Sequence, residues 1–128
     1  MRISELAQRS GATTRALRYY EAQGLLDARR SPNGYREYDE HDLQVVREIR
    51  ALASIGFTLE DTRPFVECLR AGHASGDACP DSVAAYRRKL AELDAAIAEL
   101  SVARQQIQEQ MSQALERREK TCPQRCPH

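Results

Sequence analysis

Cysteine and histidine are the residues of this 128-residue chain that are best suited to chemistry: it contains four of the first and three of the second. The last residues read Cys-Pro-Gln-Arg-Cys-Pro-His, which brings Cys122, Cys126 and His128 close together in the sequence. Thiolates and imidazoles are the preferred ligands of soft metal ions, so these residues form a candidate site for zinc, copper(I) or mercury. The same chemistry allows a thiol redox switch. Cys79 is a further candidate thiol, and Cys68 is typical of a small buried residue.

The compartment decides which thiol chemistry is available. The N-terminus MRISELAQRS lacks the apolar stretch of a secretory signal, and no segment approaches the roughly 20 apolar residues of a membrane span. We therefore expect a soluble cytoplasmic protein with reduced thiols, which disfavours a disulfide framework. We also find no Ser/His/Asp set, Gly-rich phosphate loop or HExxH motif, so we do not expect an enzyme.

Positive charge is concentrated at the N-terminus, although the chain as a whole is neutral. Nineteen Lys and Arg residues balance nineteen Asp and Glu residues. Residues 1–36, however, contain seven arginines and three acidic residues, a local excess of four positive charges. Such a local excess suits contact with phosphate groups of a nucleic acid.

The first 24 residues predict two short helices separated by a turn. Ser4 is a candidate N-cap for a helix that ends near Arg9, and Ser10-Gly11 then breaks it. A second helix is capped by Thr13 or Thr14 and ends at Gly24. This pattern fits a helix-turn-helix, whose second helix enters the major groove of DNA. The polar face of that helix carries Thr13, Thr14, Arg15 and Arg18.

The next segment predicts a two-stranded hairpin. Asn33-Gly34 suits its tight turn because both residues tolerate positive φ. Such a hairpin is typical of a wing that contacts DNA phosphates. Phosphate contacts determine affinity and position rather than sequence preference. Its arginines are Arg29, Arg30 and Arg36.

Residues 39–128 predict helices of very different length. Residues 39–70 indicate two helices joined near Gly56, followed by a connector at 71–81, a long helix at 82–118 and a tail at 119–128. Apolar residues of the long helix recur at intervals of three and four, which is typical of a coiled-coil seam. A helix of about 36 residues is about 54 Å long and needs a partner to bury this seam, so we expect a homodimer. The seam residues are Val83, Tyr86, Leu90, Leu93, Ile97, Leu100, Ile107 and Met111.

Three ordered blocks in the first 38 residues carry a family resemblance. They are Ile3-Ser4-Glu5-Leu6-Ala7, then Leu17-Arg18-Tyr19-Tyr20-Glu21 with Gly24-Leu25-Leu26, then Arg29-Arg30 with Gly34-Tyr35-Arg36 and Tyr38. With them, the chain resembles the MerR family of bacterial transcriptional regulators to about residue 118. The resemblance implies a mainly all-α fold: a winged helix-turn-helix at 1–38, a linking helix pair, and a C-terminal antiparallel coiled-coil dimerisation helix.

The resemblance also implies a mechanism and residue roles. The dimer binds a pseudo-palindromic operator between two promoter elements with and without inducer. The inducer makes the dimer bend and underwind the overlong spacer, so that RNA polymerase engages both elements. The implied DNA contacts are Arg15, Arg18, Tyr19, Arg29, Arg30, Tyr35 and Arg36.

The resemblance places a metal site at the start of the dimerisation helix. Cys79 matches the connector position at which family sensors of divalent metals carry a thiol. That thiol would join Cys122 and Cys126 of the partner subunit, with His128 or His73 as a fourth ligand. Three other functions stay open: a thiol redox sensor, a small-molecule sensor that binds near the connector, and a coiled-coil interaction protein with a vestigial head.

Overall fold

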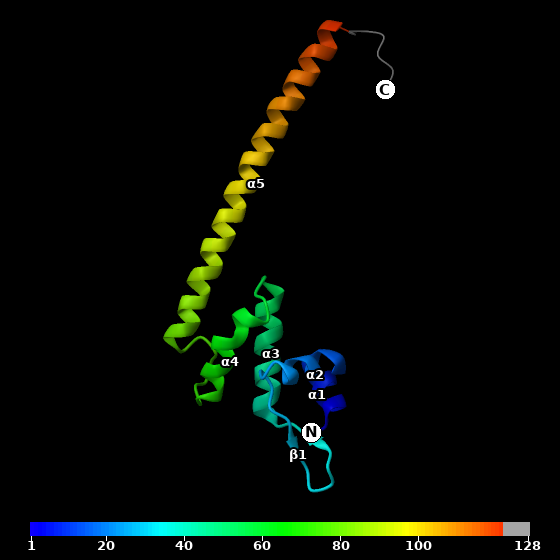
Figure 1. Cartoon of the computed structure of the whole chain (residues 1–128), viewed down its shortest axis with the longest axis vertical. Coiled ribbons are helices and arrows are strands. Elements are labelled where there is room, and N and C mark those ends of the chain that lie inside the picture. Colours follow the sequence, from blue (N-terminus) through cyan, green and yellow to red (C-terminus); the bar gives the residue numbers. More distant parts are fainter. Residues whose placement is uncertain (122–128) are drawn as a thin grey trace. The chain divides into compact units, whose positions relative to one another are not determined.

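The computed structural model describes residues 1–121, which form a mainly α-helical chain with one two-stranded sheet (Figure 1). Contacts divide the chain into an N-terminal unit, Met1–Arg87, and a second unit that begins at Arg88. The expected all-α class is therefore confirmed. The elements are α1 (Ile3–Ser10), α2 (Thr14–Ala22), β1 (Arg29–Arg30), β2 (Arg36–Glu37), α3 (Glu40–Ser54), the 3₁₀ helix η1 (Glu60–Thr62), α4 (Arg63–Arg70) and α5 (Pro80–Thr121).

Helices α1 and α2 form the helix-turn-helix. The side chain of Thr13 accepts a hydrogen bond from an amide in the first turn of α2, so Thr13 is the N-cap. Helix α1 ends at Gly11, whose φ of 78° lies in the left-handed region that favours glycine. The prediction that Ser4 caps α1 is wrong. Arg2 holds the N-cap position without a side-chain cap. Its carbonyl accepts the amide of Leu6, so Ser4 already lies inside the first turn of the helix.

Strands β1 and β2 form the predicted wing. They pair antiparallel, with Arg30 opposite Arg36. The turn between them is closed by two backbone hydrogen bonds: the amide of Ser31 donates to Tyr35 at 2.7 Å, and that of Gly34 donates to Ser31 at 2.9 Å. Gly34 has a φ of 83°, which explains why the turn needs a glycine.

Helix α3 connects three buried clusters of the N-terminal unit. The first contains α1, α2 and wing residues around Leu43 and Val46, and the second joins Val45 and Ile49 to α4. The third packs Leu52 with aromatic residues and with the start of α5. Close packing of this kind leaves little room for independent movement of its members, so α3 links the helix-turn-helix to the first turns of α5.

The buried tyrosine under the wing gives a testable pH effect. Tyr38 is 2% exposed, and its hydroxyl donates to Glu21 at 2.9 Å. Burial, followed by this hydrogen bond, raises the pKa of Tyr38 to about 12. The neutral phenol therefore contributes stability that is complete below the ordinary tyrosine pKa of about 10 and is lost as the pH rises through 12.

We expect Tyr38→Phe to lower the free energy of unfolding by about 1 kcal/mol at neutral pH. We also expect the substitution to remove part of the alkaline loss of stability between about pH 10 and pH 12. Denaturant unfolding of both proteins across this range measures the two effects. An identical alkaline loss in Tyr38→Phe would assign it to another group.

Helix α5 is longer at both ends than the predicted 82–118. It begins at Pro80, because a proline in the first helical position loses no hydrogen bond. The amides of Ser82 and Val83 donate to the carbonyl of Cys79, which places Cys79 directly before the helix. The connector is therefore residues 71–79. The helix continues to Thr121, into the segment expected to be the tail.

The apolar stripe of α5 is exposed within one chain. From Leu90 onward its side chains are between 44% and 69% exposed, at Leu93 and Leu100 respectively. Tyr86 differs from the other predicted seam residues, because its ring packs edge-on against Phe57 and Phe65 of the same chain. None of the helices in residues 1–121 has the length and apolarity that a membrane span requires. The stripe members are Leu90, Leu93, Ile97, Leu100, Ile107 and Met111.

Candidate DNA interface and thiol cluster

Helix α2 presents a polar face to solvent. Leu17 is fully buried on one side of this helix, whereas Arg15, Arg18 and Tyr19 are exposed on the other. Within residues 1–121, neither guanidinium makes a hydrogen bond or an ion pair. Thr14 is also exposed, and the Thr13 side chain is already used as the cap. Arg15 and Arg18 therefore keep all their hydrogen-bond donors for an external anion.

Two wing arginines are held by carboxylates of the chain itself. Arg29 lies 2.8 Å from oxygens of both Asp39 and Asp42, and Arg36 lies 3.1 Å from Glu21. These ion pairs attach the wing to α2 and to the start of α3. Burial is the main reason that the pKa of Asp42 is raised, and the charge of Arg29 opposes that shift.

The pairing of these carboxylates with the wing arginines was not predicted from the sequence. Asp42 lies five residues beyond the wing in an acidic run, but only the fold shows which arginine it meets. It also closes a capping box with Asp39 at the start of α3. Arg29 and Arg36 thus position the wing, and their contact with DNA stays a prediction.

A cationic hollow lies beside the wing. It measures about 230 Å³, and its lining includes Arg30, Tyr35 and Arg36. Arg2 also lines it, with its guanidinium 4.0 Å from the centre of the Tyr35 ring. Arg2 was not among the DNA contacts predicted from the sequence, although the arginine excess of residues 1–36 was a general signal for it. Three arginines around one hollow give a place where a backbone phosphate fits by charge.

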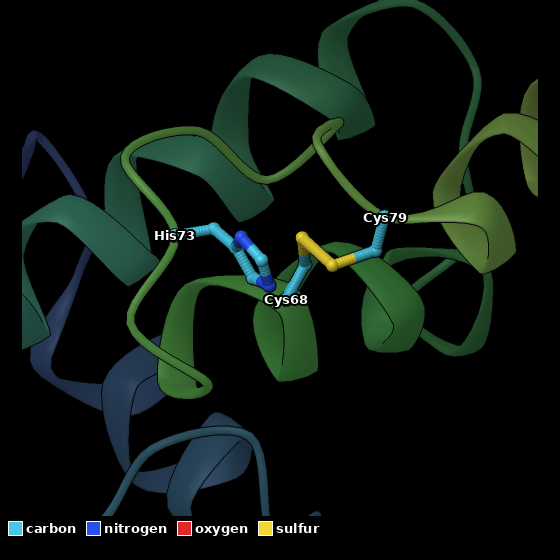
Figure 2. A group of neighbouring side chains, drawn as sticks. All are labelled: Cys68, His73 and Cys79. Atoms are coloured by element: carbon cyan, nitrogen blue, oxygen red, sulfur yellow. A yellow bond between two sulfur atoms is a disulfide. The ribbon is translucent and has the colours of Figure 1, made fainter.

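The thiols are arranged differently from the prediction. Cys68, in the last turns of α4, forms a disulfide with Cys79 (Figure 2). The expectation that these cysteines are separate, reduced thiols is therefore wrong in this structure. The physical reason is that the connector reverses the chain direction after α4 and returns Cys79 to within 5.9 Å of Cys68, Cα to Cα.

His73 completes a three-residue cluster with these sulfurs. One ligand atom from each of Cys68, His73 and Cys79 lies within 4.8 Å of the other two. Cys68 is buried, Cys79 is half-buried and His73 is exposed, so the cluster opens to solvent on the imidazole side. Cys122, Cys126 and His128 lie outside the described residues, and their predicted part in a metal site is not tested.

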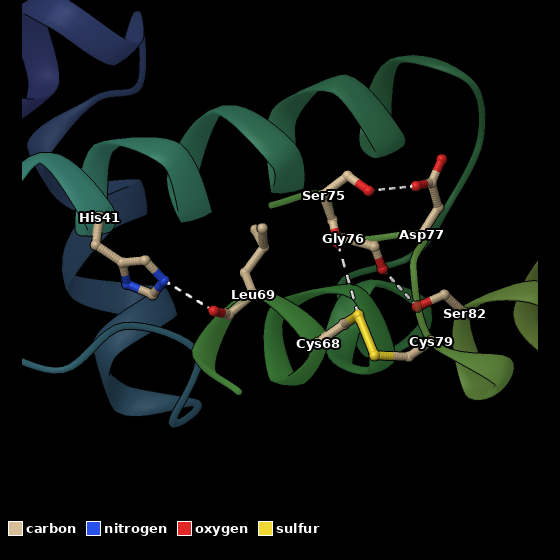
Figure 3. Close-up of a disulfide and its surroundings, with 8 residues drawn as sticks. All are labelled: His41, Cys68, Leu69, Ser75, Gly76, Asp77, Cys79 and Ser82. Atoms are coloured by element: carbon tan, nitrogen blue, oxygen red, sulfur yellow. Dashed lines mark hydrogen bonds between the residues drawn. A yellow bond between two sulfur atoms is a disulfide. The ribbon is translucent and has the colours of Figure 1, made fainter. Parts of the chain in front are cut away.

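Noncovalent contacts hold the connector against the N-terminal unit (Figure 3). The buried hydroxyl of Ser82 donates to the carbonyl of Gly76, and Ser75 donates to Asp77 at 2.7 Å. A Cβ atom at Gly76 would lie 3.0 Å from the Glu48 side chain and 3.2 Å from that of Phe65, so a larger residue here would require these neighbours to shift by a few tenths of an ångström. The connector thus has a defined path that does not depend on the sulfur bond alone.

Glu48, which faces the connector, gives a second testable pH effect. Its pKa is raised, first by burial and second by the nearby carboxylate of Asp77. Because the folded state holds this proton more tightly than the unfolded chain does, ionisation at neutral pH costs stability. We expect Glu48→Gln to raise the unfolding free energy by about 0.5 kcal/mol at pH 7, a figure reduced for the partial exposure of the group.

The Glu48→Gln gain should disappear as the pH falls below about 4, because Glu48 is then protonated in both states. Chemical unfolding at pH 7 and near pH 4 measures the difference. Glu67→Gln, at an exposed position of α4, is the matched control and should have no such gain. A pH-independent effect of Glu48→Gln would contradict the electrostatic explanation.

Family models cover both ends of this architecture. A model described as MerR HTH family regulatory protein matches residues 1–67, and one described as MerR, DNA binding matches residues 41–110. The chain belongs to the MerR family. In this MerR-family chain, the first match contains α1 to η1 with the wing, and the second extends from α3 into α5.

Curated relatives match this MerR-family protein to different extents. The nodulation protein NolA of Bradyrhizobium elkanii is 46% identical over 67 residues, which cover 52% of this chain and 31% of NolA. The chain thus spans about a third of the length of that relative. The regulator HmrR of Rhizobium leguminosarum bv. viciae is 32% identical over 108 residues, covering 84% of this chain and 81% of HmrR.

A solved MerR-type structure extends the similarity to three dimensions. The transcription regulator PbrR691 from Ralstonia metallidurans CH34, crystallised in complex with lead(II), aligns with a TM-score of 0.72. The two are 26% identical, and the alignment covers 85% of this chain and 84% of PbrR691. The family resemblance of the N-terminal blocks is therefore confirmed.

Proposed function

We propose that this MerR-family protein is a dimeric transcriptional regulator that binds promoter DNA through α2 and the wing. The observation that carries the proposal is the outer face of α2, where Arg15 and Arg18 are exposed and have no partner within residues 1–121. Their opposite face is anchored by the buried Leu17, so α2 is a rigid support for them. Arginine on a recognition helix binds both phosphates and guanine edges.

The α5 stripe supports a dimer and hence a two-fold operator. Two stripes in an antiparallel coiled coil would bury the exposed Leu and Ile side chains against each other. A two-fold dimer presents two copies of α2, which suits a pseudo-palindromic site. With inducer bound, the dimer would bend and underwind an overlong promoter spacer, which would align the two promoter elements for RNA polymerase.

The inducer of this regulator is proposed to be a thiophilic metal ion such as zinc, copper(I) or mercury. The similarity to a lead-bound regulator and the thiol at the start of α5 support this choice. Cys79 would act with Cys122 and Cys126 of the partner subunit, and with His128. Because Cys79 is bonded to Cys68 in the structure, it becomes a ligand only after reduction. That disulfide favours a second candidate function, a thiol redox sensor.

Binding-site selection followed by footprinting tests the regulatory function. The full-length protein is used to select DNA from a random library, and the selected site is then footprinted. We expect a protected site with two-fold symmetry, and an affinity that falls steeply with salt because phosphate contacts release counterions. An interaction protein with a vestigial head would select no sequence and would protect none.

In vitro transcription separates the inducers. A template that contains the selected site in its spacer is transcribed with reduced protein, with and without metal, and with peroxide in place of metal. Metal-dependent activation that Cys79→Ser abolishes supports metal sensing. Activation by peroxide alone supports the redox sensor and contradicts the metal proposal.

A further inference from the structure

We infer that Cys68, His73 and Cys79 of a single subunit bind zinc(II), or a divalent ion of similar softness, when the two thiols are reduced. The disulfide of the structure is the metal-free, oxidised form of the same cluster. This inference deepens the proposed metal response, and it rests on the proposed function only for its effect on transcription. It adds two ligands, Cys68 and His73, from the same chain as Cys79.

The positions of the three side chains suit one small ion. Their ligand atoms lie within 4.8 Å of one another, whereas donors around a tetrahedral zinc ion are about 3.5–3.8 Å apart, given bond lengths of about 2.0–2.3 Å. Figure 2 shows the imidazole of His73 directed toward the sulfurs. After cleavage of the sulfur bond the two sulfurs can move apart to this spacing, and small side-chain rotations bring the imidazole nitrogen to it as well. Three protein ligands leave a fourth tetrahedral position open for water or another thiol.

The backbone around the cluster is held without the disulfide. The amide of His73 lies 3.4 Å from the Cys68 carbonyl, and the Gln44 side chain donates to the carbonyl of Ala74 at 3.1 Å. Ser82 binds Gly76 on the other side of the connector. These contacts fix the connector at both ends, so reduction leaves the two thiols near each other. Preorganised ligands lower the cost of binding an ion.

Charge and access also favour an ion at this position. Two thiolates carry the two negative charges that neutralise a divalent ion, and the imidazole is neutral. The half-buried site therefore has no net charge when the ion is bound. Cys79 stands at the amide end of the 42-residue helix α5, where partial positive charge favours a thiolate. The exposed His73 gives the ion a route from solvent to the buried sulfur of Cys68.

Oxidation connects the loaded and the disulfide forms. A peroxide accepts two electrons from the thiolates of Cys68 and Cys79. The two thiolates, one hydrogen peroxide and two protons then yield one disulfide and two water molecules. The ion leaves because both of its sulfur ligands are consumed. The cluster would therefore release its metal under peroxide and bind it again after reduction.

Metal titration of the full-length reduced protein, without DNA, tests the inference. Cobalt(II) is added anaerobically, thiolate-to-cobalt absorption is recorded, and native mass spectrometry counts the ions that zinc(II) leaves bound. We expect one ion per subunit in the wild type. We expect Cys68→Ser and His73→Ala each to weaken binding at least about tenfold, as loss of even an outer-shell partner does. His41→Ala is the control that should retain the ion. A Cys122→Ser/Cys126→Ser double variant separates this cluster from the proposed cross-subunit ligands.

The variants distinguish this site from the cross-subunit site. Metal binding that survives Cys68→Ser and His73→Ala but is lost in the tail double variant would overturn the inference. It would instead support the cross-subunit site of Cys79 with the partner's tail thiols. Absence of any bound ion in the wild type would overturn both metal sites, and footprinting would still test the DNA-binding function separately. Because His73 is exposed, the His73→Ala variant should fold and keep the helicity of the wild type. It therefore remains a valid test if the Cys68→Ser variant does not fold.

Discussion

Replacing Arg18 by alanine is expected to weaken binding to the selected operator by about five- to 150-fold for each half-site, the range that corresponds to the roughly 1–3 kcal/mol of one specific arginine contact. The side chain is exposed on α2 and has no partner within residues 1–121, so its loss leaves the core intact. Fluorescence anisotropy at fixed salt measures the affinity, and a salt series measures the number of phosphate contacts. Arg15→Ala is expected to act in the same direction.

Arg88→Ala is the matched control for this prediction, because Arg88 lies on α5 outside the predicted seam. It removes the same charge from an exposed position of α5, in the second unit, and should change operator affinity less than about twofold. An equal loss in both variants would mean that net charge, rather than the α2 face, governs binding. Arg29→Ala is expected to lower protein stability as well as operator affinity, because it leaves the buried carboxylate of Asp42 without its arginine partner.

Replacing Ile97 by aspartate is expected to raise the dimer dissociation constant at least about a thousandfold. Ile97 is 61% exposed in the single chain and lies on the apolar stripe, so both copies would be buried in the dimer. Each buried isoleucine contributes about 1.5–3 kcal/mol, and burial of two carboxylates adds a further penalty. The two isoleucine losses together with the carboxylate penalty exceed the roughly 4 kcal/mol that corresponds to a thousandfold change. Sedimentation velocity measures the association state, and operator affinity should fall with it.

Val102→Asp is a closely matched control for Ile97→Asp. Val102 is a β-branched residue on the same helix and is 57% exposed, but it lies outside the predicted seam. Its substitution introduces the same charge and a similar loss of helix propensity. A dimer that is equally weakened by both substitutions would contradict the seam assignment. Circular dichroism checks that both variants keep α5 helical.

The local features of this protein could be predicted from sequence because near neighbours in the chain determine them. The Thr13 cap depends on amides within the next turn, and the wing turn depends on a glycine at position 34 that accepts positive φ. The stripe of α5 follows from a period of three and four residues, whatever the helix packs against. These rules also gave the helix-turn-helix and the mainly α-helical class.

The contacts between distant segments were decided only by the tertiary structure. Cys68 joins Cys79 because the connector reverses direction, and no spacing rule for cysteines predicts that reversal. Arg29 meets Asp42 because the wing folds onto the start of α3. Tyr86 shows the same limit, since it fits the heptad spacing but its ring packs on Phe57 and Phe65 of its own chain. Periodicity identifies which face of a helix is apolar, whereas the packing of separate elements determines what covers that face.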